Sequence, residues 1–272
     1  MNMKKIARTS KLLLSKITPG IYFLGSILIL YTIWYFISKA TNGEIPYPSE
    51  SLKQGYELFF LEDPFYDNPD DPGYKGILTQ LISSLKRVMS GFILGSLVAI
   101  PLGFLMGSSA MGMNLLNPLV QILRPVSPLA WFPLGMIALK SASGATVFMI
   151  FITCLWPTLI NTAFGVASLP IDHKNVAKAF GFSKFKYIFK IVIPYALPHI
   201  LTGLRLSIGV AWMVIVAGEM LSGGIGLGFF VWDSYNGGSL ERVLLAILII
   251  GIVGIGLDKV FSILQKKFKY VS

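Results

Sequence analysis

Long runs of apolar residues make up most of the chain, and short polar segments separate them. An α-helix needs about 20 residues to cross about 30 Å of hydrocarbon. Six runs approach or exceed this length, at approximately 17–37, 78–108, 115–139, 145–168, 195–221 and 243–264. Strands of about ten residues with alternating polarity, which would indicate a membrane β-barrel, are absent. The pattern therefore predicts an all-α membrane protein with six transmembrane helices.

The same pattern divides the chain into segments. We expect an N-terminal segment 1–16, a first transmembrane helix 17–39, a polar loop 40–77, a core of five transmembrane helices 78–265 and a tail 266–272. Composition agrees, because 54% of the residues are hydrophobic and only 13% are charged, against about a quarter charged in soluble domains. The only cysteine, Cys154, falls inside a predicted span. A single cysteine excludes an intramolecular disulfide and a metal site made of clustered cysteines.

Lysine and arginine are distributed unequally between the two predicted sides of the membrane. The net charge is +10, but the cations lie at the edges of apolar runs, which argues against a nucleic-acid partner. Cytoplasmic loops are enriched in Lys and Arg, so the richer side is predicted to be inside. It holds the N-terminal cluster together with Arg124, Lys174, Lys178, Lys184, Lys186, Lys190, Lys259, Lys266, Lys267 and Lys269. Both termini are therefore expected inside.

Two segments do not fit this scheme completely. The N-terminal basic cluster and apolar run also resemble a secretory signal, but the run is long and no clean cleavage site ends it, so we favour an uncleaved helix. Lys86 and Arg87 lie on the predicted outer side, within the second span. That span is expected to start later or to have an amphipathic outer end.

The loop between Thr41 and Gly76 carries eight acids and is expected outside, either as a solvated cover of the pore mouth or as a partner contact.

The segment 171–194 is a basic, polar interruption between the fourth and fifth spans. Asp172 is predicted to cap a helix that runs to about Phe180, and Gly181 suits the left-handed position after a helix end. Val176, Ala179 and Phe180 would share one side of this helix, with Lys174 and Lys178 on another. Ser183 is predicted to cap a second helix, and Pro194 to break the chain before the fifth span.

Charges inside a bilayer are costly and therefore suggest a function. Arg205, Trp212 and Glu219 follow one another at steps of seven and would share one helical stripe, with Arg205 and Glu219 about 21 Å apart. The third span contributes a second set of candidates: Arg124, Trp131 and Lys140. The hypothesis is that some of these side chains make a path electropositive for a small anion. The alternative is that the arginines bind phosphates or helix-end carbonyls as interface anchors and so hold the helices in place.

Several kinds of chemistry lack their signatures. The sequence has no G-x4-G-K-[ST] phosphate loop, so energy would come from a separate subunit or from an ion gradient. His173 and His199 do not form a metal-ligand pair, so no metal or catalytic residue is assigned. An ion-coupled secondary transporter would favour internal repeats and paired intramembrane acids, and Glu219 and Asp258 look isolated. A membrane enzyme would require clustered His, Asp or Glu.

The interruption also carries a recognisable motif. Its order N-V-A, three residues, Gly181, nine residues and I-V-I-P resembles the E-A-A-x3-G-x9-I-x-L-P loop of ABC importer permeases, with departures at Asn175, Val176 and Ile193. The similarity extends over residues 78–265, including RPVSPLAWFPL and AGEMLSGGIGLGFFVWDSYN. These stretches resemble the nitrate, sulfonate, taurine and bicarbonate branch. PFYDNPDDPGYKG and WPTLINTAFGV look closest to nitrate-type permeases.

The resemblance implies a type I importer permease in the bacterial inner membrane, with a periplasmic loop 40–77 and a cytoplasmic coupling helix. The coupling residues would be Lys174, Asn175, Val176, Ala177, Lys178, Phe180 and Gly181. The implied partners are cytoplasmic P-loop ATPase subunits that bind ATP and Mg, a periplasmic binding protein and a second permease copy. The chain itself would hold no cofactor and perform no catalysis. Nitrate or nitrite is the expected substrate, with bicarbonate, cyanate or a sulfonate such as taurine as alternatives.

Overall fold

The computed structural model describes the backbone of residues 3–60 and 76–268 and the side chains of residues 20–55 and 76–268. Within these ranges every regular element is a helix, which confirms the all-α prediction. The elements are α1 (Met3–Ala40), α2 (Pro48–Phe60), α3 (Gly76–Ser108), α4 (Ala110–Leu123), a 3-10 turn η1 (Pro128–Trp131), α5 (Phe132–Leu139), α6 (Ala142–Ala167), α7 (Ile171–Ala179), α8 (Lys184–Tyr187), a π-turn η2 (Ile188–Val192), α9 (Ile193–Ser222), α10 (Leu227–Asn236) and α11 (Leu240–Phe268).

Five stretches of these helices are long and apolar enough to cross a membrane. They are Gly20–Ala40, Gly76–Ser108, Ala142–Ala167, Lys184–Ser222 and Leu240–Phe268. The predicted third span, 115–139, is not one helix, because α4 and the stretch Pro128–Leu139 meet at 96°. Ser127 has extended ψ, as expected of a residue before proline. The six predicted spans are thus five helices and one broken pair.

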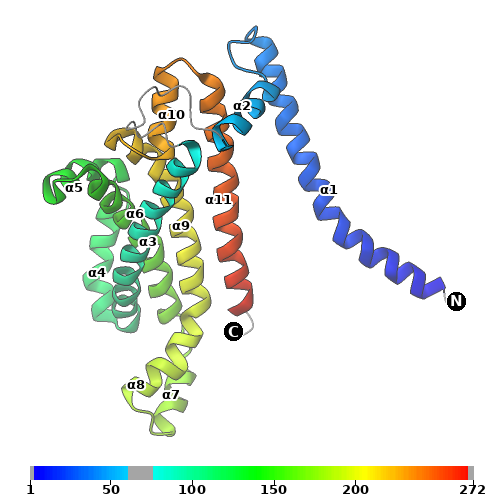
Figure 1. Cartoon of the computed structure of the whole chain (residues 1–272). Helices are drawn as coiled ribbons and strands as arrows, with labels where there is room; N and C mark the ends of the chain where they lie inside the picture. The colour runs from blue at the N-terminus through cyan, green and yellow to red at the C-terminus, as the bar shows by residue number, and fades with distance from the viewer. Residues whose placement is uncertain (1–2, 61–75, 269–272) are drawn as a thin grey trace.

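The core of the bundle forms where α6 packs between α3 and α9, and α11 covers the other side of α9 (Figure 1). Four glycines of α3 face α6 so closely that a Cβ atom at each would meet α6: Gly91, Gly95, Gly103 and Gly107. Small residues four apart let helix backbones approach, so these glycines allow the close contact between α3 and α6. Pro101 and Pro157 lie inside continuous helices.

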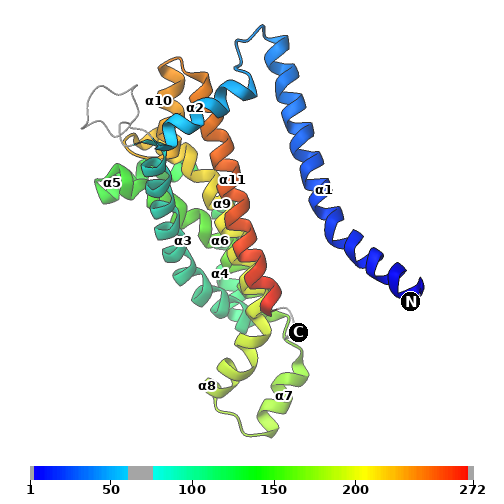
Figure 2. The ribbon, with the colours of Figure 1, turned by 45° about the vertical axis from the view of Figure 1, so that its right-hand side comes forward.

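The N-terminal arm departs from the bundle. Helix α1 stands apart from the other helices, while α2 crosses over the end of α11 (Figures 1 and 2). The indole of Trp34 and the hydroxyl of Ser38 both donate to the carbonyl of Pro46, which fixes the elbow between α1 and α2. Gly55 of α2 lies against Leu245. The segment 40–77 therefore contains a packed helix, not only an open loop; residues 61–75 lie outside the described range.

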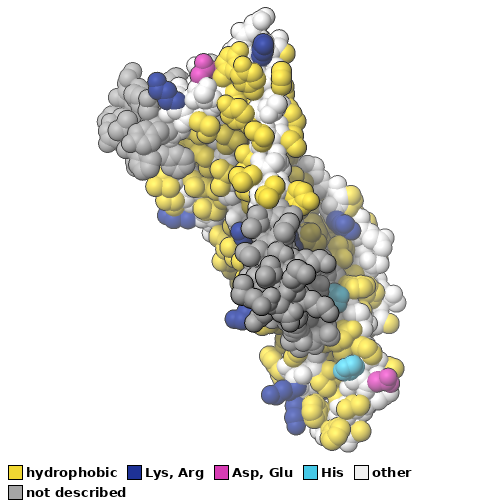
Figure 3. All heavy atoms as spheres, turned by 90° about the vertical axis from the view of Figure 1, so that its right-hand side faces the viewer, with side chains coloured by type: hydrophobic (Ala, Val, Ile, Leu, Met, Phe, Trp, Pro, Cys, Tyr) yellow, Lys and Arg dark blue, Asp and Glu magenta, His cyan; other side chains and the backbone are white. Residues whose placement is uncertain are grey.

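The ends of the chain agree with the predicted topology. The first and last described residues lie toward the end of the molecule that carries α7 and α8, whereas α2 and α10 lie at the opposite end (Figures 1 and 2). We call these the α7 end and the α10 end. Figure 3 shows a group of Lys or Arg side chains at the α7 end, and further ones spread along this face toward the α10 end. The arrangement matches the prediction that both termini share a side with the basic interruption.

Candidate functional site

Helix α7 forms where the sequence predicts an amphipathic helix, with one difference at its start. It begins at Ile171 directly after Pro170, and Asp172 lies in its first turn instead of capping it. It ends at Ala179, and Gly181 takes a φ of +63°. The amide of Phe182 then bonds back to the carbonyl of Ala177 at 2.9 Å. This left-handed closure confirms the predicted role of Gly181 as the residue that turns the chain.

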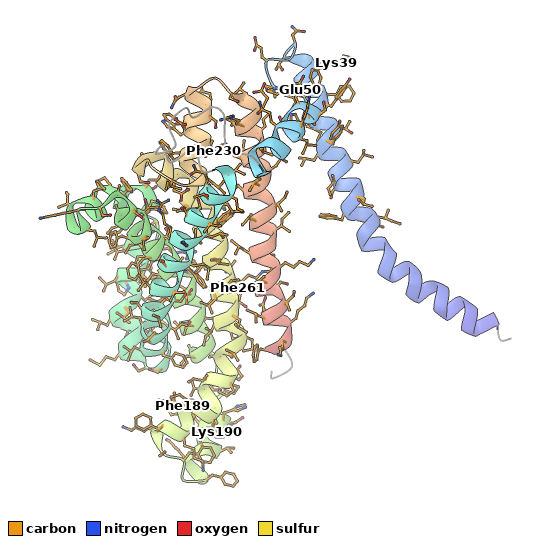
Figure 4. The ribbon with its side chains drawn as sticks, in the orientation of Figure 1. Lys39, Glu50, Phe189, Lys190, Phe230 and Phe261 are labelled. Atoms are coloured by element: carbon orange, nitrogen blue, oxygen red, sulfur yellow. The ribbon has the colours of Figure 1, made fainter. Side chains whose placement is uncertain are left out.

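The side chains of α7 and α8 present an apolar surface. Val176 and Phe180 are 53% and 76% exposed, and Phe185 and Phe189 are 77% and 63% exposed. We call these four residues the coupling surface, after the role that the sequence motif leads us to expect; Phe189 is labelled in Figure 4. Lys174, Asn175 and Lys178 are exposed beside it. Ala177, also predicted to contact a partner, is 4% exposed and so packs the loop internally.

The helix after this surface continues into the bundle without a break. Ser183 accepts from the amide of Lys186 and caps α8, as predicted. The π-turn η2 follows, in which the amide of Ile193 bonds to the carbonyl of Ile188. The wider π-turn precedes Pro194, which has no amide hydrogen to donate. Pro194 therefore lies near the start of α9, and the predicted break is wrong.

At the α7 end of the bundle, Arg205 of α9 binds Asp258 of α11. Its Nε and Nη2 atoms lie 2.7 Å from Oδ1 and Oδ2, a two-point geometry that suits guanidinium and carboxylate. Gln265 of α11 in turn donates to Thr202 at 2.7 Å. Seven residues along α9, the indole nitrogen of Trp212 donates to the carbonyl of Ile250 of α11 at 2.8 Å. These contacts join α9 to α11.

At the α10 end, Glu219 of α9 is fully buried. Its carboxylate accepts from Arg87 and from Ser84, both at 2.7 Å, and from the amide of Gly228 at 2.9 Å. Arg87 also donates to the carbonyl of Ile225. The charge that looked misplaced at Arg87 and the acid that looked isolated at Glu219 therefore neutralise each other, across 132 positions of sequence.

Side chains of α3 complete the same network. The amide of Leu227 bonds to Ser84 at 2.9 Å, and the amide of Gly226 bonds to Gln80. The first amides of a helix have no partner within it, and here α3 and α9 supply those partners for α10. The glycine-rich segment 222–228 is thus a tight connection held by a buried carboxylate.

The predicted stripe of Arg205, Trp212 and Glu219 exists, but it faces neighbouring helices. Each of the three side chains has a partner in α11 or α3. These contacts favour the anchoring interpretation over the anion path for this set. The sequence missed Arg87, Ser84 and Asp258 as partners. The only hint in the sequence was the position of Arg87 inside a predicted span, where a charged side chain requires a counter-ion.

The other candidates lie along the broken span. Arg124 follows α4 at the break and lines a cavity between α4 and α6. Trp131 ends the 3-10 turn, and its indole nitrogen is buried without a hydrogen-bond partner among the described residues. Lys140 ends α5 in a left-handed conformation, exposed. Three or more His, Cys, Asp or Glu side chains do not cluster as a metal site anywhere in the described ranges.

Comparison with known proteins shows which family shares this helical bundle. Residues 91–270 match the family described as "Binding-protein-dependent transport system inner membrane component". The chain belongs to this family. It is an inner-membrane ABC importer permease, and the secondary-transporter interpretation is set aside. The permease match spans the elements from within α3 to the end of the chain.

Relatives and a solved structure agree with this assignment. The nitrate import permease protein NrtB of Synechocystis sp. is 41% identical over 240 residues, covering 88% of this permease and 86% of NrtB. The bicarbonate transport system permease protein CmpB of Synechocystis sp. is 42% identical over 251 residues, covering 92% and 88%. An inward-facing structure of the MetNI methionine ABC transporter has a TM-score of 0.65 at 13% identity, covering 71% and 96%. That likeness shows the type I permease fold.

Proposed function

We propose that this permease carries nitrate, or nitrite, across the inner membrane as part of an ATP-driven importer. The NrtB relative supports the substrate, because it is 41% identical over 88% of the chain. The CmpB relative, at 42% identity, makes bicarbonate the second candidate. Cyanate and sulfonates such as taurine rest on the branch resemblance alone. Membership of the permease family identifies the chain as part of an ABC importer, and the identity of the imported anion is what we propose.

The observation that carries the coupling mechanism is the exposed coupling surface. Phe180 and Phe185 are more than three quarters exposed, on a loop that projects beyond the bundle (Figure 1). Several large apolar side chains exposed on one polar loop are typical of a protein interface. We assign this surface to a P-loop ATPase subunit, with Lys174, Asn175 and Lys178 at its margin and Gly181 setting its shape.

The backbone offers a route from the coupling surface to the opposite end. The stretch Lys184–Ser222 is long enough to be one span, so movement of α8 would pass directly into α9. Along α9, Arg205 and Trp212 hold α11, and Glu219 holds α3 and α10. ATP binding in the partner subunits would thereby move α9, α11 and the α10 turn together. The ATPase subunits would bind ATP and Mg, and this chain would contribute no catalytic group.

The remaining partners complete the importer. A periplasmic binding protein would deliver the anion to the α10 end, and a second copy of this permease would form the other half of the path. We retain three candidates for lining that path: Arg124 directly after α4, Trp131 in η1 and Lys140 directly after α5. Arg205, Trp212 and Glu219 contribute as anchors of the moving helices.

The test of this function is co-purification with defined variants. A tagged permease should retain an ATPase subunit in equal amount, and a Phe180→Asp/Phe185→Asp variant should lose it while the permease remains in the membrane. Uptake of labelled nitrate should then be competed by unlabelled nitrate and nitrite, not by bicarbonate. Uptake of labelled bicarbonate without uptake of labelled nitrate would transfer the substrate to the second candidate, and undiminished ATPase binding by the variant would refute the docking surface.

A further inference from the structure

A cavity of about 790 Å³ lies along α4, bordered by the α7-end halves of α3 and α6. Met106 of α3 and Ala163 and Phe164 of α6 form its apolar walls. Its polar side comes from α4, where Asn117, Gln121 and Arg124 line it. These three residues follow one another at four and three positions, so they share one face of the helix and span about 10 Å of its length.

The charge balance of the cavity is positive. Its described lining includes one guanidinium and two amides, and it includes neither Asp nor Glu. An arginine presents five donors in a planar fork, and amide side chains add further donors. Planar oxyanions such as nitrate or bicarbonate match two-point donation from a guanidinium. The amides would bind the remaining oxygens.

Arg124 differs from the other arginines whose contacts are known. Arg87 and Arg205 each bind a carboxylate at 2.7 Å. Among the described side chains, Arg124 makes no such ion pair or side-chain hydrogen bond; only its backbone amide bonds, to Val120. Arg124 lies exposed at the break that follows α4, so its guanidinium is available to an anion from outside the chain.

We propose that Arg124, Gln121 and Asn117 form an oxyanion subsite inside the α4 cavity, passed by the transported anion. The inference rests on the proposed function, because it assigns the imported anion to a defined place in the permease. The cavity is much larger than a small anion, so the anion binds with accompanying water. Such binding is weak, as passage through a path requires. A phosphate of an anionic lipid has the same oxyanion chemistry, and the experiment separates these two sources.

The experiment uses the complete complex of permease and ATPase subunits in nanodiscs of zwitterionic lipid, with no binding protein. Equilibrium dialysis measures bound, isotope-labelled nitrate, and proteoliposomes containing the binding protein measure ATP-dependent uptake. Arg124→Gln should lower both nitrate binding and uptake at least tenfold, and Arg124→Lys should retain a third or more of each. Gln121→Glu should weaken both by repulsion. Asn114→Asp, an acid on the same exposed helix but outside the cavity lining, should leave both unchanged.

Two results would overturn the subsite. One is Arg124→Gln with nitrate binding and uptake within twofold of the unchanged complex. The other is unchanged nitrate binding together with loss of co-purified anionic lipid, which would assign the cavity to a lipid phosphate. If the unchanged complex carries bicarbonate and not nitrate, the proposed substrate fails. The same variants then test the subsite with labelled bicarbonate, so the two failures are distinguishable.

Discussion

The carboxylate of Glu219 and the guanidinium of Arg87 lie 2.7 Å apart, between α9 and α3, with Glu219 fully buried. Around this pair the amides that begin α10 find their acceptors. The ion pair therefore does more than neutralise two charges in a membrane. It fixes the turn at the α10 end to the helix that begins at the coupling surface.

Replacing one partner of this ion pair should destabilise the fold more than expected from the effect of replacing both partners together. Glu219→Gln alone leaves the Arg87 charge without its counter-ion, and removing one partner of a buried pair lowers the free energy of unfolding by about 3–5 kcal/mol. The double variant Arg87→Gln/Glu219→Gln should lose less than the sum of the single variants. A double-mutant cycle on denaturant unfolding in detergent measures this difference. Strict additivity would show that the pair does not couple α3 to α9.

The closeness of Gly226 to Glu219 predicts a local steric effect. A Cβ atom at Gly226 would overlap the Glu219 carboxylate, so Gly226→Ala should displace that group and reduce transport. Gly224 also has positive φ, at +83°, but has open space around it. Gly224→Ala is therefore the matched control for backbone strain alone. Equal loss of uptake in the two variants would contradict a role for the Glu219 contact.

Gly181 should depend on its backbone conformation and not on space. Its φ is +63°, and nothing lies within 4 Å of a Cβ placed there. A left-handed conformation costs about 1–2 kcal/mol for most residues but less for Asn. Gly181→Val should therefore reduce the coupling of ATP hydrolysis to uptake, whereas Gly181→Asn should largely preserve it. The ratio of anion transported to ATP hydrolysed measures this. Equal ratios in both variants would contradict a role for the left-handed conformation of Gly181 in coupling.

Phe180 should be an energetic centre of the ATPase contact. Buried aromatic side chains at interfaces contribute about 2–4 kcal/mol when truncated, so Phe180→Ala should weaken ATPase retention at least tenfold. Phe36 of α1 is 61% exposed and lies one turn before Lys39, which Figure 4 shows at the opposite end of the molecule from Phe189. Phe36→Ala should retain the ATPase fully in a pull-down. Similar retention by both variants would place the contact elsewhere.

The Arg205–Asp258 pair provides a direct test of anchor against path. If it only joins α9 to α11, the exchanged pair Arg205→Asp/Asp258→Arg should recover assembly and uptake lost by Arg205→Asp alone. If Arg205 binds the anion, the exchange should restore assembly but not uptake. Membrane yield of the complex and nitrate uptake, measured on the same preparations, distinguish the two outcomes. The two-point contact at 2.7 Å predicts full recovery.

The sequence predicts elements that depend on local patterns. Apolar length located the spans, and Gly181 and Ser183 marked helix ends. What it missed depends on distant pairing or on competition between local rules. Arg87 and Glu219 are 132 positions apart, so nothing local shows that they meet. Pro194 predicts a break, but the π-turn before it keeps the helix continuous.

For the same reason, the sequence predicted where the candidate site lies but not which of its side chains are exposed or what they contact. The motif spacing located α7, yet it did not show that Ala177 is buried or that Phe185 and Phe189 extend the exposed surface. The stripe of Arg205, Trp212 and Glu219 followed from helical periodicity. Periodicity gives a shared side but not the neighbour that side contacts. In the folded chain the neighbours are α11 and α3.

The central claim is that this permease moves nitrate only when its coupling surface engages an ATP-hydrolysing partner. Nitrate accumulation in proteoliposomes, with ATP on the α7 side and loaded binding protein on the α10 side, tests it most directly. We predict accumulation that requires both the ATPase subunits and hydrolysable ATP. Accumulation by the permease alone, driven by an ion gradient, would contradict the account.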